Sequence, residues 1–251
     1  MKHILLLLGL WCLQLLVFGC GSSISQEERQ KRADIQYKLG IAEFNRGSLP
    51  DALAAFQKAL EHSPDAKTHN ALGLIYLEQG SYQKAITYFK KALQLDPNFL
   101  DPYNNLGTTY ARLGDWDKAI AEYQKVINDP LYRTPELAHY NLGLALMEKG
   151  DNINAVKQFH NAIQRRPNFV QALDKYGIAL YRMNRNQEAI KRFKQAIELV
   201  PDFIESYLNL GMVYMKLGQT AEAISQFKYV LEHSKQSNLS ADAARYLEML
   251  E

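Results

Sequence analysis

The sequence predicts an all-α protein built as a solenoid of six helical hairpins. A glycine recurs at intervals of 33 to 36 residues, an alanine follows each glycine by twelve residues, and an aromatic side chain follows each alanine by four. A unit of this length cannot bury an apolar face alone, so neighbouring units must stack. The three columns are Gly40, Gly73, Gly107, Gly143, Gly177 and Gly211, then Ala52, Ala85, Ala119, Ala155, Ala189 and Ala223, then Phe56, Phe89, Tyr123, Phe159, Phe193 and Phe227.

Each unit divides into two helices at a turn. In five units a second glycine lies seven residues after the first, which predicts that the first helix ends there in a left-handed turn residue. Asn184 stands at this place in the fifth unit and also tolerates that conformation. Proline then marks the end of the second helix in four units. The turn glycines are Gly47, Gly80, Gly114, Gly150 and Gly218, and the prolines are Pro64, Pro97, Pro167 and Pro201.

Side-chain size predicts how the helices pack. The small glycine and alanine columns belong where the two helices of a hairpin cross closely. The aromatic column and the large residue just before each motif glycine are expected to fill the space between neighbouring hairpins. This last column is Leu39, Leu72, Leu106, Leu142, Tyr176 and Leu210.

These columns resemble the tetratricopeptide repeat, a helix-turn-helix unit with small residues at the same places. The resemblance covers residues 33–237, with an insertion within Asn128–Pro135 before the fourth unit. It implies a right-handed superhelical solenoid whose first helices line the concave surface. Residues 238–251 are expected to form a capping helix, with Ser240 as the N-cap and Ala244, Leu247 and Leu250 on its apolar face.

The first nineteen residues predict a secretory signal peptide, because Lys2 precedes a short apolar run over Ile4–Phe18. Val17-Phe18-Gly19-Cys20 resembles the lipobox of bacterial lipoproteins. This resemblance implies that the Cys20 thiol receives diacylglycerol, that fatty acids such as palmitate complete the anchor, and that residues 20–32 form a polar tether. A free or intermolecularly bonded Cys20 remains the alternative.

Gly21, which follows Cys20, resembles lipoproteins retained at the outer membrane and implies a lipid-anchored location on its periplasmic face. Stable anchoring by more than one acyl chain is consistent with this location. The predicted partners are therefore a membrane, through the lipid, and another protein.

The net charge of +2 argues against a general nucleic-acid partner. The charge is nevertheless uneven, since the span from Lys149 to Lys194 holds ten lysines and arginines against Asp151, Asp174 and Glu188. Two interpretations stay open: solvated helix faces, or a docking patch for an acidic protein segment or an anionic glycolipid.

The sequence predicts no enzyme, cofactor, metal site or small-molecule substrate. It contains no HExxH, GxSxG, GxGxxG or phosphate-loop motif. The histidines outside the signal peptide fall in different units, and His69 and His139 share a column with tyrosines that favours packing. They are His62, His69, His139, His160 and His233.

A protein-binding groove is expected along the first helices. Apolar residues one and four places after the motif glycines, together with Tyr37, face the concave side, and asparagines two places before them could bond an extended peptide backbone. Ordinary repeat packing explains part of this apolarity. The candidate groove residues are Tyr37, Ile41, Phe44, Leu74, Leu77, Asn105, Asn141, Met147, Tyr181, Met212 and Met215.

A lipoprotein made of six such units directly after the cysteine resembles the type IV pilus pilotins of the PilF, PilW and Tgl group. The insertion from Asp129 to Glu136, followed by Ala138-His139-Tyr140-Asn141-Leu142-Gly143, is similar to that group's segment between the third and fourth repeats. The resemblance implies a non-enzymatic adaptor that aids localisation and multimerisation of an outer-membrane secretin. The alternative is a periplasmic scaffold that recruits peptidoglycan-processing or other envelope enzymes.

Overall fold

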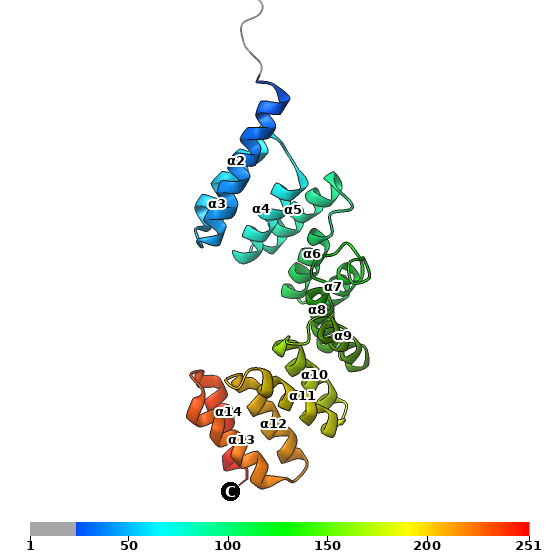
Figure 1. Cartoon of the computed structure of the whole chain (residues 1–251), viewed down its shortest axis with the longest axis vertical. Helices are drawn as coiled ribbons and strands as arrows, with labels where there is room; N and C mark the ends of the chain where they lie inside the picture. The colour runs from blue at the N-terminus through cyan, green and yellow to red at the C-terminus, as the bar shows by residue number, and fades with distance from the viewer. Residues whose placement is uncertain (1–23, 251) are drawn as a thin grey trace, which may run out of the picture.

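A computed structural model describes residues 24–250, and in this part of the chain it contains thirteen α-helices and no strand. The predicted fold is confirmed: the helices pair into six hairpins that stack along the long axis, followed by a single helix (Figure 1). The predicted signal peptide and Cys20 lie outside the described residues. The first helices are α2 (Gln26–Asn45), α4 (Ala66–Glu78), α6 (Asp101–Arg112), α8 (Pro135–Glu148), α10 (Val170–Arg182) and α12 (Ile204–Lys216). The second helices are α3 (Leu49–His62), α5 (Tyr82–Leu95), α7 (Trp116–Gln124), α9 (Asn152–Arg165), α11 (Asn186–Leu199) and α13 (Thr220–His233), and α14 spans Ser237–Glu248.

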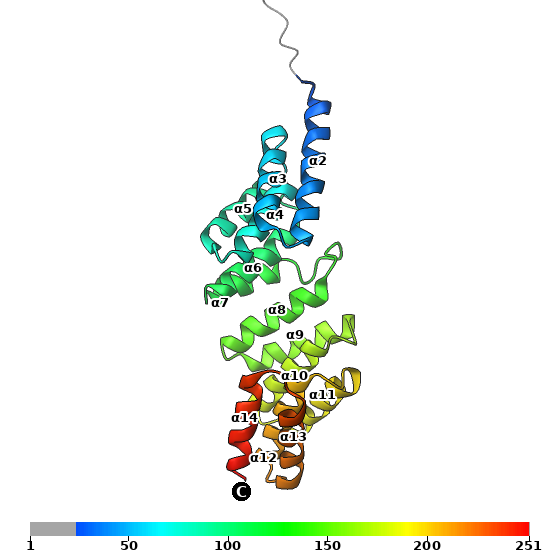
Figure 2. The ribbon, with the colours of Figure 1, turned by 90° about the vertical axis from the view of Figure 1, so that its left-hand side faces the viewer.

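The first helices line the inner side of a bent stack. Each first helix from α4 to α10 contacts the first helix of the next hairpin, and α12 contacts α14. Neighbouring second helices within residues 24–250 do not contact one another to this degree. Figure 1 shows the bend, with both ends of the stack on the left and the middle hairpins on the right, and Figure 2 shows the same stack from the side. The closer spacing of the first helices produces the concave surface.

The turns between paired helices adopt the predicted backbone conformation. All five turn glycines have positive φ, from 70° at Gly80 to 83° at Gly150, and Asn184 takes the same role with φ 60°. Glycine is favoured at these turns because residues with a Cβ atom are sterically disfavoured in the left-handed region. The prolines likewise lie just beyond the ends of α3, α5, α9 and α11, as predicted.

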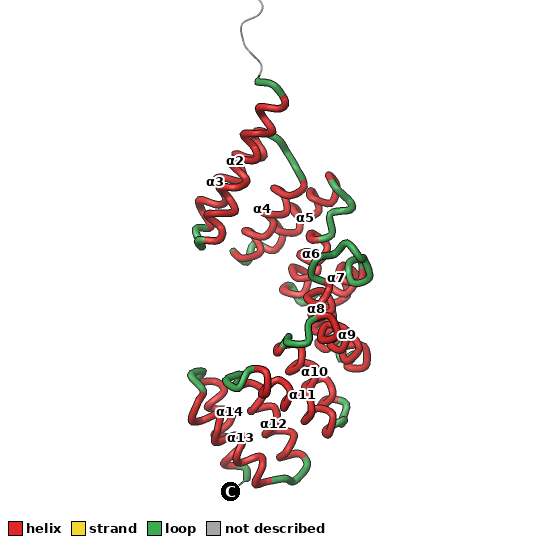
Figure 3. The backbone as a smooth tube through the Cα atoms, viewed as in Figure 1, coloured by secondary structure: helices red, strands yellow, loops and turns green. Residues whose placement is uncertain are grey.

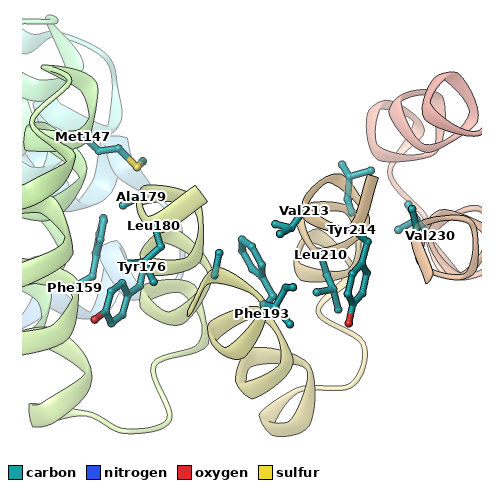
Figure 4. Close-up of a cluster of buried hydrophobic side chains, with 14 of the residues drawn as sticks. Met147, Phe159, Tyr176, Ala179, Leu180, Phe193, Leu210, Val213, Tyr214 and Val230 are labelled. Atoms are coloured by element: carbon teal, nitrogen blue, oxygen red, sulfur yellow. The ribbon is translucent and has the colours of Figure 1, made fainter. Parts of the chain in front are cut away.

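The aromatic column packs on glycine, a contact that the spacing of the columns does not predict. A Cβ added to Gly73 would lie 2.4 Å from the ring of Phe89, and the other five motif glycines face the aromatic residue of their own hairpin in the same way. The rings therefore fill the helix crossing within each hairpin as well as the space beyond it. Phe159, for example, also approaches Tyr176 and Leu180 of the next hairpin (Figure 4).

The column before the motif glycine packs between hairpins, as expected. Leu72 is fully buried and the later members of the column are at most 7% exposed, whereas Leu39 is 46% exposed. Within residues 24–250 no hairpin precedes α2, so Leu39 lacks the packing partner that the later members of the column have.

Three segments differ from the sequence-based expectation. Helix α2 begins at Gln26 with Ser25 as its N-cap, so the expected tether over 20–32 is helical in its last part, where two i,i+4 ion pairs support it. Helix α14 begins at Ser237 rather than after Ser240, and Ala243 rather than Ala244 is its fully buried alanine. Helix α7 has only nine residues, and the chain then turns through 125–134 before α8 (Figure 3).

No helix among the described residues is both long enough and apolar enough to cross a bilayer.

The buried alanine column gives a direct test of the packing. Ala119 of α7 is fully buried and Ala121 on the same helix is exposed. Replacing Ala119 with leucine should lower the free energy of unfolding by about 1–3 kcal/mol through overpacking. Ala121→Leu is the matched control and should change stability little. Similar thermal melts for the two variants would contradict the assigned packing.

Candidate functional site

A ladder of polar side chains crosses the concave surface. The side-chain amide of Asn105 donates to Oδ1 of Asn70 at 2.9 Å, and that of Asn141 donates to Oδ1 of Asn104 at 3.4 Å. We expected Asn105 and Asn141 to bond a partner's backbone. The structure instead uses one amide hydrogen of each to join neighbouring repeats, so each has a single amide hydrogen left for a ligand.

The ladder continues in the fifth and sixth repeats through a carboxylate that sequence reasoning missed. Asp174 is fully buried and its Oδ1 accepts hydrogen bonds from Ser206 and Asn209, both at 2.9 Å. Lys175 lies 3.3 Å from its other oxygen. A buried charge is tolerated only with such partners, so this group holds the two repeats together. The sequence pattern that indicates this ladder is an Asn two places before the motif glycine, paired with an Asn or Asp three places before the motif glycine of the preceding repeat.

The first repeat lacks this ladder and opens into a recess. Tyr37 and Ala71 stand where three later pairs of neighbouring repeats place hydrogen-bonded polar side chains. Next to Tyr37, α2, the start of α4, the α5–α6 loop and the α7–α8 connector enclose a space of 460 Å³. A second space of 490 Å³ adjoins it, since both share Tyr37, Lys67 and Phe99. We call these together the N-terminal recess, lined chiefly by Tyr37, Lys67, Phe99, Asp101, Leu131 and Arg133.

The N-terminal recess combines apolar rings with charges at its edge. Burial raises the pKa of the Tyr37 hydroxyl, and the nearby Asp65 and Asp101 carboxylates raise it further. Burial also raises the pKa of Asp101, while the Arg133 guanidinium lowers it. Lys67 and Arg133 are exposed at the rim, and Leu131 is 82% exposed on the connector. Such a site can hold an apolar side chain while its rim contacts the polar backbone on either side.

The structure separates the apolar residues expected at this end of the groove. Tyr37 lines the N-terminal recess, but Leu77 lines a different space of 250 Å³ beside Thr108 and Arg112. Phe44 is half-buried against the core of the first hairpin, and Leu74 packs against the next core cluster. Ile41 is 37% exposed. Tyr37 and Leu77 therefore line two separate spaces.

The expected groove residues at the other end are mostly half-buried. Tyr181, Met212 and Met215 pack against the C-terminal core cluster, and the Lys216 ammonium lies 4.5 Å from the Tyr181 ring centroid. The prediction for Met147 is wrong, because its side chain is only 5% exposed. It points toward α10 near Ala179 and belongs to the core (Figure 4).

The histidines within the solenoid act in packing and hydrogen bonding. Nδ1 of His69 lies 2.8 Å from the Asp65 carbonyl, and Nδ1 of His139 lies 2.7 Å from Oε1 of Gln158. Burial lowers the pKa of His139, while its hydrogen bond to Gln158 raises it. Within residues 24–250 no three His, Cys, Asp or Glu side chains come together as metal ligands.

Comparison with known proteins gives the family directly. A tetratricopeptide repeat model matches residues 32–98 and 104–169, and related repeat models match 76–130, 177–218 and 205–237. No curated protein sequence matches the chain significantly.

Among solved structures, PilF of Pseudomonas aeruginosa matches with a TM-score of 0.77 and 19% identity, covering 88% of this chain and 99% of that one. PilW, described as a widely conserved type IV pilus biogenesis factor, matches with a TM-score of 0.76 and 21% identity over 83% of this chain and 97% of its own. MamA matches with a TM-score of 0.60 and 30% identity over 64% of this chain and 94% of its own. The helical hairpins, the motif columns and the extent of the family match together show that this chain belongs to the tetratricopeptide repeat family.

Proposed function

We propose that this protein is a pilotin-like adaptor of type IV pilus biogenesis, held at the periplasmic face of the outer membrane by a lipid on Cys20. The observation that carries the proposal is the match in fold to PilF and PilW over nearly their whole length. The lipobox-like Val17–Cys20 segment supports the same role.

The proposed partner is an outer-membrane secretin, and the action is non-covalent. The lipid brings the adaptor to the membrane in which the ring assembles. The N-terminal recess then holds an apolar segment of a secretin subunit, with Tyr37 and Phe99 as the apolar contacts. Binding of this kind protects strand edges from pairing wrongly before the ring is complete.

The test is the amount of heat-resistant secretin multimer in cells that lack this protein. We expect monomer to accumulate and multimer to fall, together with a loss of pilus-dependent motility. An unchanged multimer-to-monomer ratio in the deletion strain would contradict the pilotin role. Recovery of cell-wall hydrolases rather than secretin with the lipidated protein would favour the scaffold alternative.

The recess itself is best tested at exposed residues. Phe44 and Leu77 are half-buried, so serine at either position would weaken packing as well as binding. Leu131 and Lys67 are exposed at the rim of the recess, and Leu131→Ser with Lys67→Glu should leave folding intact. We expect this double variant to reduce the secretin multimer ratio.

The control for the rim variant is Leu113→Ser with Lys90→Glu, which changes an exposed leucine and an exposed lysine away from the recess. It should behave as wild type at equal abundance. Equal multimer ratios in both double variants and the wild type would show that the N-terminal recess is not the secretin site. The deletion strain would still test the proposed pilotin role.

A further inference from the structure

The outer faces of α9 and α11 carry positive charge that the fold does not neutralise. Of the ten lysines and arginines between Lys149 and Lys194, only Lys149, Lys175 and Arg185 form ion pairs within the described residues. The other seven have no carboxylate within ion-pair distance in this part of the chain. They are Lys157, Arg165, Arg166, Arg182, Lys191, Arg192 and Lys194.

The acidic residues of the same span are already engaged. Asp151 caps α9 by accepting from the Asn154 amide at 3.1 Å, Asp174 is buried in the polar ladder, and Glu188 pairs with Arg185 at 2.6 Å. Glu198, near the end of α11, is exposed and lines a recess at this surface. The excess of cations is therefore a property of the folded surface and not only of the composition.

The repeat register places part of this charge at equivalent positions of neighbouring repeats. Lys157 and Lys191 both stand two residues after a motif alanine, so they occupy equivalent places on the neighbouring second helices α9 and α11. Both are exposed, as is Lys194, and Arg192 is half-buried beside them. We call Lys157, Lys191, Arg192 and Lys194 the α9–α11 surface.

A recess with a mixed lining lies between α9, α10 and α11 and has a volume of 610 Å³. Its apolar lining residues are Ile163, Pro167, Leu173 and Leu199, and its polar lining residues are Gln164, Arg192, Gln195 and Glu198. Tyr176 lies under Arg192, whose guanidinium carbon is 4.8 Å from the ring centroid, and His160 approaches the same ring from α9 at 6.3 Å. Leu199 is 46% exposed, so apolar surface remains open to a partner.

We infer that the α9–α11 surface docks an acidic protein segment that places one large apolar side chain in the recess beside Leu199. Charge complementarity selects a negatively charged partner, because cations without internal counterions attract one from solution. The recess favours a protein over a lipid surface, since a bulky side chain can fill it. Figure 1 places α9 and α11 in the lower half of the stack, far along the array from α2, where the chain enters from the proposed anchor.

The probe is a dye-labelled, glutamate-rich peptide with one central tryptophan, measured by fluorescence anisotropy with the purified full-length protein. The variant is K157Q/K191Q/K194Q. The matched control K58Q/K90Q/K228Q removes three exposed lysines from α3, α5 and α13 that also lack ion pairs in the described structure. We expect the first variant to weaken binding roughly tenfold and the control to stay within about twofold, with binding falling as salt rises.

Three results would overturn the inference. An equal loss in both triple variants would mean that overall charge and not this surface attracts anions. No binding of the peptide by the wild type would mean that the surface does not dock an acidic segment. Binding to phosphatidylglycerol vesicles without binding to the peptide would assign the surface to a membrane.

A separate test addresses the recess. The L199A variant removes the protein side of the proposed contact, and a peptide with alanine in place of tryptophan removes the peptide side. If the tryptophan lies beside Leu199, the combined loss should be no larger than either single loss. Fully additive losses would contradict the proposed seating of the apolar side chain.

Discussion

Replacing Gly73 with alanine should lower the free energy of unfolding by about 3 kcal/mol, the upper part of the usual range for overpacking. The added Cβ would lie 2.4 Å and 2.5 Å from two carbons of the Phe89 ring, closer than real Cβ contacts. Phe89 is fully buried, so the ring cannot move away without disturbing the surrounding core. Urea denaturation followed by circular dichroism measures the change.

Gly80→Ala is the control, because a Cβ there meets nothing within 4 Å and only the positive φ of 70° opposes it. It should cost about 1 kcal/mol from left-handed strain alone. Adding Phe89→Leu to the Gly73 variant should recover part of the loss by making room for the new methyl group. If the Gly73→Ala variant is no less stable than the Gly80→Ala variant, the Phe89 ring does not pack closely against Gly73.

The same contact explains which parts of the fold could be predicted from the sequence. A small residue facing a large one every repeat is visible in a single sequence, because each hairpin solves the same packing problem. The turn conformation of Asn184 was likewise predictable from its position. The direction of the Phe89 ring was not, since glycine at the crossing is compatible with a ring on either side of the helix pair.

The candidate site was less predictable because it depends on how repeats differ. Asn105 and Met147 stand in columns that face inward, but their neighbours determine whether they are free to bind a partner. Asn70 accepts a hydrogen bond from the Asn105 side-chain amide, and α10 covers Met147. The N-terminal recess depends on two loops whose paths leave no periodic signal. Only Tyr37 of its lining was predicted, from its place on the inner side of the first helix.

Replacing Cys20 with serine should release this protein from the membrane fraction almost completely, provided that Cys20 carries the proposed lipid. Each buried methylene of an acyl chain contributes about 0.8 kcal/mol, and two or more chains make the anchoring stable. Serine cannot form the thioether, and no helix within residues 24–250 can substitute as a membrane span. Fractionation and intact mass measure the outcome.

Cys12→Ser is the matched control, since Cys12 lies in the predicted signal peptide and should be absent from the mature chain. That variant should fractionate with the membrane and carry the same lipid mass as the wild type. If the Cys20 variant stays in the membrane at normal abundance and the wild type carries no lipid mass, the anchor is wrong. A wild-type band that shifts under non-reducing conditions would then favour the intermolecular disulfide. The proposed secretin role would then lack a mechanism that brings the protein to the membrane. The tetratricopeptide fold and its two recesses do not depend on the lipid.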